Sequence, residues 1–427
     1  MMEKQRAMAS ETISEPRRKN PVLRTPRPTV PTGKRSRAAL GLTAAAARGR
    51  LELQVCQDCG STQYPPREIC GSCLSHRLIW RAQDGRGELI AETALRVAQE
   101  LYFRERTPWR VGTVRLDVGV YVIAFVHERV GAAPCRVRVT AALDRSGQAV
   151  LLALPEHGAA DLSEDAKMRE LTCDPRSRKV LITDGKSAIG QAVARALAAA
   201  GAASIWVGES EPWKKVAGFE ALRDLPQAKF VPLDVTDGRS VRELAGEIGA
   251  KVDILINTAD CHRTFSIAAR RGVETAQLEM EVNYFGLLRL AQEFAPILKA
   301  RAADGPASAV AWVNVLSIFA LSNYPPQGTY SASKAAALSL SQALRAELQP
   351  AGVRIINLFP GPIDDEWDQL VLPPKLAPKV VAAAVVEALK SSVEDVYPGD
   401  VAQDWLARYL ENPKALEREL TAHEPSA

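Results

Sequence analysis

The sequence predicts an α/β protein in which a doubly wound parallel sheet is preceded by a small cysteine-rich unit and a β-barrel. From about residue 179, strand-like and helical segments alternate to the end, an order typical of a parallel sheet with helices on both faces. From about residue 85 to 155, short β-type runs are separated by Gly and Pro. Two Cys-x-x-Cys pairs precede these runs, and 427 residues are too many for one ordinary core.

The chain therefore divides into five parts. We expect a disordered basic tail (residues 1–37), a helix with a cysteine ribbon (38–80), a β-barrel (81–157), a linker (158–177) and a C-terminal α/β domain (178–427). The clearest barrel runs are GTVRLDVGVYVIAFV and CRVRVTAAL. The expected strands of the α/β domain are KVLIT, ASIWVG, KFVPLDV, VDILIN, AVAWVNV and RIINLF.

Charge is distributed unevenly along the chain. Residues 1–50 hold 12 Lys and Arg against 3 Glu, so this stretch carries +9 and the remainder −5. The stretch is rich in Pro and Arg and has no hydrophobic run of a secretory signal. It is either a solvated extension, which we favour, or a contact for nucleic acid or an acidic partner. No apolar run approaches the roughly 18 to 20 residues that cross a bilayer, so we expect a cytoplasmic protein without membrane contact.

The cysteine pairs indicate a metal site. Cys56-x-x-Cys59 and Cys70-x-x-Cys73 are separated by ten residues. Each pair brings two thiolates to one side of a tight turn, and two facing turns form a tetrahedral four-sulfur cage that suits zinc. Such a closed site has no open coordination position, so the zinc should be structural. The alternatives are a metal-free ribbon and a redox dithiol, and His76 is expected to be a bystander.

The ribbon and barrel contain GRLELQVCQDCGSTQYPPREICGSC, then GRGEL and PWRVGTVRLDVGV. Over roughly residues 38–155 the chain thus resembles the bacterial zinc-ribbon/OB-fold proteins associated with acyl-CoA enzymes. The resemblance implies binding of acyl-CoA or a related thioester, or scaffolding beside a thiolase- or aldolase-type partner enzyme. An OB-fold barrel alone also suits nucleic-acid binding. Because this barrel lacks the interleaved aromatic and basic residues of a stacking groove, we expect no nucleic acid.

In the C-terminal domain, Tyr330-Ser-Ala-Ser-Lys334 opens the helical stretch YSASKAAALSLSQALRAEL. Residues i and i+4 share one helix face, so the phenol and the ammonium can act together. A nearby positive charge lowers the pKa of a phenol from about 10 toward the working range, which predicts Tyr330 as a general acid/base. Ser317 lies 13 residues upstream, just after the run AVAWVNV, and Asn283 falls on the preceding helix.

These residues, in this order, resemble the short-chain dehydrogenase/reductase family over about residues 178–420, with a Rossmann-type sheet. The alternative is a coincidence of four polar residues. The resemblance implies a catalytic tetrad of Asn283, Ser317, Tyr330 and Lys334. In it, Tyr330 exchanges a proton with the substrate oxygen, and Ser317 hydrogen-bonds the carbonyl. Lys334 binds the nicotinamide ribose and tunes the phenol, and Asn283 holds a water for proton relay.

The expected cofactor loop departs from the family pattern. TGxxxGxG reads TDGKSAIG here, at residues 183–190. Glycines in this loop permit a tight turn and close approach of the backbone to the pyrophosphate. Only the third, Gly190, is retained, and Ala188 adds one methyl group. Asp184 adds a carboxylate close to a dianionic ligand, whereas Gly185 and Lys186 can absorb part of the turn and of the charge.

A second departure follows the fourth strand, where the family's NNAG reads NTAD at residues 257–260. After the second strand, Glu209 would accept hydrogen bonds from the ribose of NAD and repel the 2′-phosphate of NADP, so NAD is favoured over NADP. The expected cofactor-binding residues are Thr183, Asp184, Gly185, Lys186, Ile189, Gly190, Glu209, Asp234, Val235, Asn257, Ala259, Tyr330, Lys334, Pro360, Gly361 and Ile363.

Two functions follow from these patterns. The first is an NAD(P)-dependent oxidoreductase that interconverts a ketone and a secondary alcohol on a 3-oxoacyl or 3-hydroxyacyl-CoA thioester. The second is a non-catalytic accessory subunit of a thiolase- or aldolase-type enzyme, with a degenerate cofactor loop. The intact tetrad favours the first, and the altered glycines favour the second. Family resemblance also implies a homodimer or homotetramer, with AAALSLSQALRAEL packing across a two-fold axis.

Overall fold

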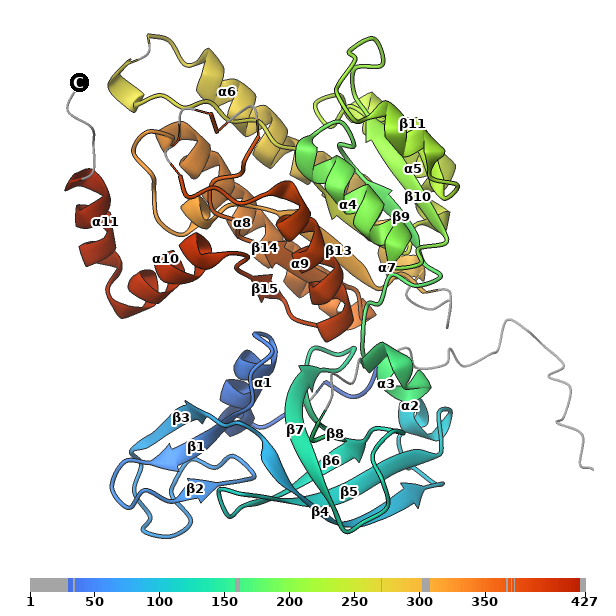
Figure 1. The fold of residues 1–427 in the computed structure, drawn as a ribbon, viewed down its shortest axis with the longest axis vertical. Coiled ribbons are helices and arrows are strands. Elements are labelled where there is room, and N and C mark those ends of the chain that lie inside the picture. Colours follow the sequence, from blue (N-terminus) through green and yellow to red (C-terminus); the bar gives the residue numbers. More distant parts are fainter. Residues whose placement is uncertain are drawn as a thin grey trace, which may run out of the picture.

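The computed structural model of the chain describes residues 30–33, 35–157, 162–269, 271–301, 308–365, 368–369, 371 and 373–422. Most of the expected tail lies outside these residues. Figure 1 shows two lobes, a β-rich one formed by the first part of the chain and an α/β one formed by the second. Among the described residues, no helix is both long and apolar enough to span a bilayer.

The β-rich lobe contains a ribbon and a barrel, as the sequence predicts. The ribbon follows helix α1 (Leu40–Ala46), and its strands have the order β2-β1-β3. Its strands are β1 (Glu52–Cys56), β2 (Thr62–Gln63) and β3 (Leu78–Ala82). The closed barrel has the order β4-β5-β6-β8-β7. Its elements are β4 (Arg86–Leu95), α2 (Leu101–Arg104), β5 (Trp109–Leu116), β6 (Tyr121–Val126), β7 (Cys135–Leu143) and β8 (Ala149–Pro155).

The α/β lobe is built on a seven-stranded parallel sheet with the order β11-β10-β9-β12-β13-β14-β15. This confirms the predicted doubly wound sheet. The strands are β9 (Lys179–Ile182), β10 (Ser204–Glu209), β11 (Ala228–Pro232), β12 (Ile254–Asn257), β13 (Ala311–Val315), β14 (Arg354–Leu358) and β15 (Asp395–Val396). The first six coincide with the expected runs. The two-residue β15 was not expected, because two residues carry no period that a sequence pattern can reveal.

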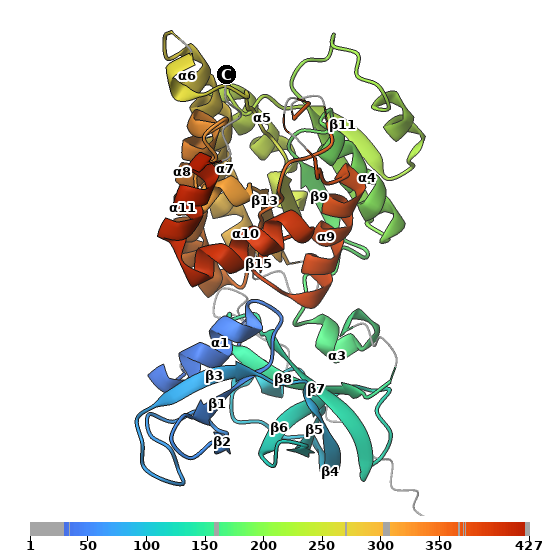
Figure 2. The same cartoon turned by 60° about the vertical axis from the view of Figure 1, so that its left-hand side comes forward.

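Helices cover both faces of the sheet (Figure 2). One core cluster packs α4 and α9 against the sheet, and the other packs α5, α7 and α8 against the opposite face. The helices of this lobe are α4 (Ala188–Ala199), α5 (Gly238–Ile248), α6 (Glu274–Met280), α7 (Leu287–Arg301), α8 (Gly328–Leu348), α9 (Pro378–Ser391), α10 (Asp400–Glu411) and α11 (Pro413–Ala422). A π-helical turn, Glu281–Gly286, joins α6 to α7.

The two lobes are bonded to each other directly. The buried Arg354 of β14 donates to the carbonyl oxygens of Leu143 (3.1 Å) and Asp144 (2.8 Å), at the end of β7. Arg145 donates to the hydroxyl of Ser308 at 3.0 Å. The segment expected to be a linker contains helix α3 (Ala166–Arg169), and its apolar residues pack in a cluster with residues of β7 and β8. The linker thus adds apolar contacts to the barrel.

Candidate active site and metal centre

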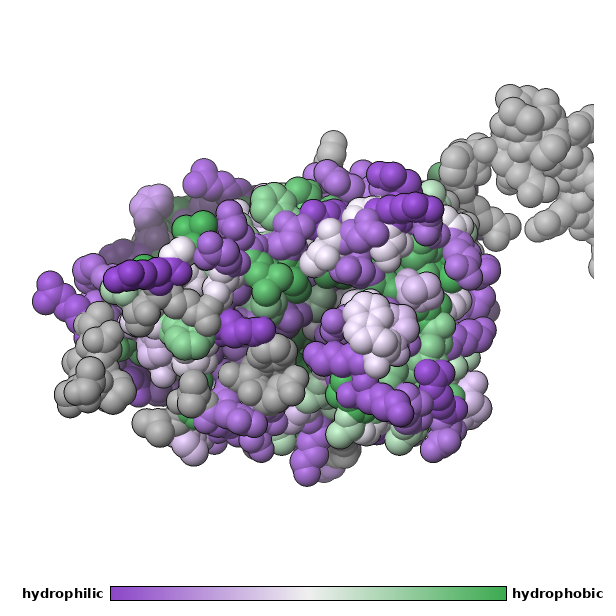
Figure 3. Space-filling model, turned by 90° about the horizontal axis from the view of Figure 1, so that it is seen from above, coloured by the Kyte–Doolittle hydropathy of each residue, from purple (hydrophilic) through white to green (hydrophobic). Residues whose placement is uncertain are grey.

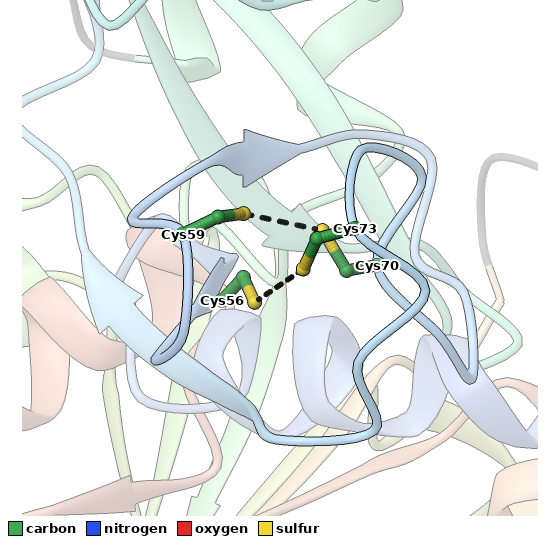
Figure 4. A group of neighbouring side chains, drawn as sticks. All are labelled: Cys56, Cys59, Cys70 and Cys73. Carbon is green, nitrogen blue, oxygen red and sulfur yellow. Dashed lines mark hydrogen bonds between the residues drawn. The ribbon is translucent and has the colours of Figure 1, made fainter.

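The four ribbon cysteines face one another, as Figure 4 shows. The Sγ atoms of Cys56 and Cys73 are 3.6 Å apart, and so are those of Cys59 and Cys70. All four Sγ atoms lie within 4.8 Å of one another. A tetrahedral zinc with Zn–S bonds of about 2.3 Å needs sulfurs roughly 3.8 Å apart, so the cage fits the ion.

The four expected catalytic residues lie together at the carboxyl end of the central strands. Tyr330 and Lys334 occupy the first turns of α8, and Ser317 follows β13. Asn283 lies in the π-helical turn, where its amide donates to the Cys261 carbonyl (2.8 Å) and to Ser333 Oγ (2.9 Å). All four side chains are buried.

The phenol of Tyr330 does not have the lowered pKa that the sequence suggests. Burial raises the pKa of Tyr330 well above its usual value, and the carboxylates of Asp260 and Asp368 add to the rise. A hydrogen bond with Ser317 acts in the opposite direction. The expectation that Lys334 lowers the pKa of Tyr330 is therefore wrong. The ammonium of Lys334 lies 5.6 Å from the Tyr330 ring centroid and is already paired with an acid.

That acid is Asp260, which stands where the family pattern has glycine. Its carboxylate lies 2.8 Å from Lys334 Nζ through one oxygen and 2.9 Å from His262 Nδ1 through the other. Burial works against the charge of Asp260, but Lys334 and His262 outweigh it and hold the pKa of this carboxyl far below its usual range. Asp260 is therefore ionised. Its carboxylate is paired with the ammonium of Lys334, which in the family pattern binds the nicotinamide ribose.

His262, Asp365, Asp368 and Gln327 form a polar group beside Tyr330 that sequence reasoning missed. The rings of His262 and Tyr330 are 4.9 Å apart, and His262 Nε2 lies 3.5 Å from Asp368 Oδ1. Burial lowers the pKa of His262, but its contacts with Asp260 and Asp368 prevail and raise the pKa to about 10. The sequence signal was slight: a histidine two residues after NTAD and an acidic run after the Pro-Gly-Pro turn.

The glycine-rich turn is closed by Asp184 itself. Asp184 Oδ1 accepts from the amides of Lys186 (2.9 Å) and Ser187 (3.3 Å), just before α4. Burial raises the pKa of Asp184, while these two amides act in the opposite direction. The retained Gly190 is required, because a Cβ there would collide with the Asp184 carbonyl oxygen. The carboxylate thus uses amide donors at the end of the helix where family members hold the pyrophosphate.

Lys186 turns away from this loop toward the second strand. Its ammonium lies 2.8 Å from Glu209 Oε1 and donates to the backbone carbonyls of Glu211 and Lys214. Since Lys186 is only 9% exposed, the ion pair is largely shielded from water. Glu209, which was expected to accept hydrogen bonds from the adenosine ribose, is therefore already paired with the ammonium of Lys186.

The other expected cofactor residues surround the same edge of the sheet. Thr183 Oγ1 donates to Asn257 Oδ1 at 2.8 Å, which joins the ends of β9 and β12. Asp234 accepts from the amide and hydroxyl of Thr236 and so fixes the turn before α5. Ile363 donates to Asp368 Oδ2. The remaining positions are the partly buried Ile189 and the buried Gly185, Val235, Ala259, Pro360 and Gly361. In the space-filling view this side of the lobe is hollowed near its centre (Figure 3).

Comparison with known proteins agrees with this architecture. Residues 178–372 match the family described as short chain dehydrogenase. Residues 43–78 match the "ChsH2, rubredoxin-like zinc ribbon domain", and residues 80–143 match the "ChsH2, C-terminal OB-fold domain".

Individual relatives are similar to part of this chain. The short-chain dehydrogenase PC-15 of Penicillium crustosum is 34% identical over 35% of this chain and 54% of its own length. The probable dehydrogenase/reductase VdlC of Helicobacter pylori is 32% identical over 39% of this chain and 60% of its own length. The chain thus spans little more than half the length of these relatives. The uncharacterized oxidoreductase Rv1543 of Mycobacterium tuberculosis is 31% identical over 54% of this chain and 69% of its own length.

A solved structure gives the same result. A short chain dehydrogenase from Burkholderia cenocepacia, crystallised with NADP, is 34% identical and aligns with a TM-score of 0.52 over 59% of this chain and all of that one. The chain belongs to the short-chain dehydrogenase family, and a zinc ribbon and an OB-fold barrel precede its dehydrogenase domain.

Proposed function

We propose that the chain is an NAD(P)-dependent oxidoreductase that interconverts a ketone and a secondary alcohol. The observation that carries this proposal is the convergence of Asn283, Ser317, Tyr330 and Lys334 in one buried group. In this proposal, Tyr330 holds the proton that the substrate oxygen gains or loses, and Ser317 orients the phenol and the carbonyl. Asn283 fixes the backbone of residue 261 and, through Ser333, the start of α8.

The residues present fit a dinucleotide on two conditions. The first turn of α4 offers backbone amides to the pyrophosphate. The carboxylate of Asp184, however, must either stay beside the phosphate charge or release the two amides that donate to it. Lys334 must exchange Asp260 for a ribose hydroxyl. When bound, the nicotinamide supplies or accepts a hydride at the carbonyl carbon. Thr183, Ile189, Gly190 and Asn257 would hold the remaining backbone contacts.

Glu209 favours NAD over NADP, because its carboxylate repels a 2′-phosphate. Lys186 weakens this preference, since its ammonium neutralises that carboxylate at 2.8 Å. A Lys186→Ala variant should therefore lose affinity for NADPH more than for NADH. Fluorescence titration with both cofactors measures the ratio, and a larger loss for NADH would contradict this assignment.

We further propose that the substrate is an acyl-CoA thioester, with the barrel holding part of it. An apolar cavity of about 770 Å³ lies between α1, the ribbon loop and the barrel, a volume usual for small-molecule sites. Its walls include Leu42, Tyr64, Trp109, Val111 and Phe125, with Arg35 among the lining residues. An apolar acyl or pantetheine chain suits these walls, and the guanidinium suits a phosphate.

Blocking this cavity tests the substrate class. Val111→Trp fills it, whereas Val118→Trp adds the same group at a 43% exposed position outside the cavity wall. Calorimetry with a medium-chain acyl-CoA should show binding to the parent and to Val118→Trp, and at least tenfold weaker binding to Val111→Trp. Equal binding by both variants would refute the assignment.

Turnover tests the main proposal. The protein should oxidise NADH or NADPH in the presence of a 3-oxoacyl-CoA, and Tyr330→Phe should abolish turnover with cofactor affinity nearly unchanged. Turnover that survives Tyr330→Phe would rule out the assigned acid/base.

The accessory-subunit function remains a second candidate, and one observation favours it. Asp260 and Asp184 engage the ammonium and the amides that a cofactor needs. In that case neither NADH nor NADPH binds, and the protein co-purifies with a thiolase- or aldolase-type enzyme. Such co-purification from the native host, combined with absence of cofactor binding, would replace the oxidoreductase proposal.

Self-association is proposed to use helix α8. Its outward positions Ala332, Ala335, Ser339 and Ala343 are small and exposed, which allows two copies of the helix to approach closely. We expect a homodimer or homotetramer by light scattering, and Ala335→Arg should produce monomers. A parent protein that is already monomeric would exclude this packing.

A further inference from the structure

Three side chains with metal-binding groups meet beside Tyr330, apart from the ribbon cysteines. His262 follows β12, while Asp365 and Asp368 lie in the segment after β14. One ligand atom from each lies within 4.8 Å of the other two. His262 and Asp368 are only 4% and 5% exposed. This grouping combines an imidazole with two carboxylates in a largely buried place.

The imidazole is oriented from behind. Asp260 Oδ2 contacts His262 Nδ1 at 2.9 Å, so Nε2 is directed toward Asp368 Oδ1 at 3.5 Å. A carboxylate on one ring nitrogen is the usual support of a metal-binding histidine, because it fixes the ring and makes the other nitrogen a better ligand for the ion.

Asp368 is also held in place. Its Oδ2 accepts from the amide of Ile363 at 2.8 Å, and its Oδ1 accepts from Gln327 Nε2 at 2.9 Å. Its own amide donates to Asp365 Oδ1 at 3.2 Å, which ties the two carboxylates together. The oxygens keep further lone pairs for an ion.

Gln327 gives an independent indication of a missing ligand. Its side chain is 1% exposed, and one amide group bonds both Asp368 and Thr264 through Nε2. Within the described part of the chain, its Oε1 has no hydrogen-bond donor. A buried acceptor of this kind calls for a water or an ion. A water bound to a cation at the three side chains would supply the donor.

The charges point the same way. Asp260, Asp365 and Asp368 bring three carboxylates to this place; among the described residues Lys334 lies 2.8 Å from Asp260, and His262 holds a proton between Asp260 and Asp368. Buried charge without compensation is costly. A divalent cation that displaces the Nε2 proton of His262 would add one positive charge to this acidic group.

We propose that His262, Asp365 and Asp368 bind a divalent cation, with Asp260 as the positioning residue of the imidazole. The nitrogen and oxygen donors suit Mn²⁺ or Zn²⁺ rather than a soft ion. Because the His262 ring is 4.9 Å from the Tyr330 ring, the cation lies beside the phenol. There it can polarise a carbonyl oxygen as a Lewis acid. The site does not depend on the proposed redox activity.

The test is a titration of the zinc-loaded full-length protein with Mn²⁺, followed by electron paramagnetic resonance of the free ion. The ribbon thiolates prefer zinc, so Mn²⁺ reports the second site. We expect binding of about one Mn²⁺ per chain with the zinc content unchanged. Asp368→Asn and His262→Gln should each weaken binding more than about tenfold, and Asp260→Asn should weaken it by about tenfold.

Asp364→Asn is the matched control, because Asp364 is exposed in the same segment and is not a member of the group. It should bind Mn²⁺ like the parent. Unchanged zinc content and thermal melting establish that each variant is folded. Absence of Mn²⁺ binding in the parent would overturn the proposal. So would binding that Asp364→Asn weakens as much as Asp368→Asn or that His262→Gln leaves unchanged.

Discussion

Replacing Asp260 with glycine should strengthen cofactor binding. The perturbation restores the residue that the family has at this position and frees Lys334, whose Nζ is 2.8 Å from the Asp260 carboxylate. Two unit charges about 4 Å apart attract by about 4 kcal/mol at an effective dielectric constant of 20. Asp260 is 27% exposed, and the ribose replaces a charged partner by neutral hydroxyls, so only part of this energy is recovered.

A hydrogen bond to a charged group contributes roughly 1.5 to 3 kcal/mol. We take about 2 kcal/mol as the binding free energy that the cofactor loses because Lys334 is paired with Asp260. Affinity for NADH should then rise by about 30-fold in Asp260→Gly. Asp260→Asn, which keeps the size and removes the charge, should show a smaller gain. Fluorescence titration of each variant provides the measurement, with Asp364→Gly as the control. Unchanged or weaker NADH binding by a folded Asp260→Gly protein would show that Asp260 does not oppose the cofactor.

Three further predictions follow from the same geometry. Because burial raises the pKa of Asp184, lowering the pH protonates this carboxyl and removes its repulsion of the pyrophosphate; NADH affinity should therefore rise as pH falls, and Asp184→Asn should abolish the trend. Because burial also raises the pKa of Tyr330, the phenol keeps its proton, so the rate of ketone reduction should stay level into the alkaline range; a loss of rate just above neutral pH would contradict this. Cys70→Ser should remove the ribbon zinc, measured by metal analysis, and lower the free energy of unfolding of the β-rich lobe by several kcal/mol, of the order expected for a structural zinc site.

Much of the fold could be predicted from the sequence, because it depends on local periodicity. The runs that became β9 to β14 are short and mostly apolar. The ribbon followed from cysteine spacing, since two tight turns leave little choice of partners. Tyr330 and Lys334 could be placed on one face of α8 for the same local reason.

The interactions of the site could not be predicted, because they join distant segments. The pairing of Asp260 with Lys334 spans two elements and cancels the charge that was expected to lower the pKa of Tyr330. The contact of His262 with Asp368 depends on how the segment after β14 returns to the sheet. Likewise, Lys186 was expected to offset the charge of Asp184, which it does in part, but its closest acidic partner is Glu209 at 2.8 Å. Only tertiary structure decides among partners of equal charge.

Cofactor titration of the parent protein tests the oxidoreductase proposal. The zinc-loaded chain is titrated with NADH and with NADPH by fluorescence and by calorimetry. We expect saturable binding, with NADH the tighter ligand. Absence of binding of both at millimolar concentration would contradict the oxidoreductase proposal and leave the accessory-subunit function in its place.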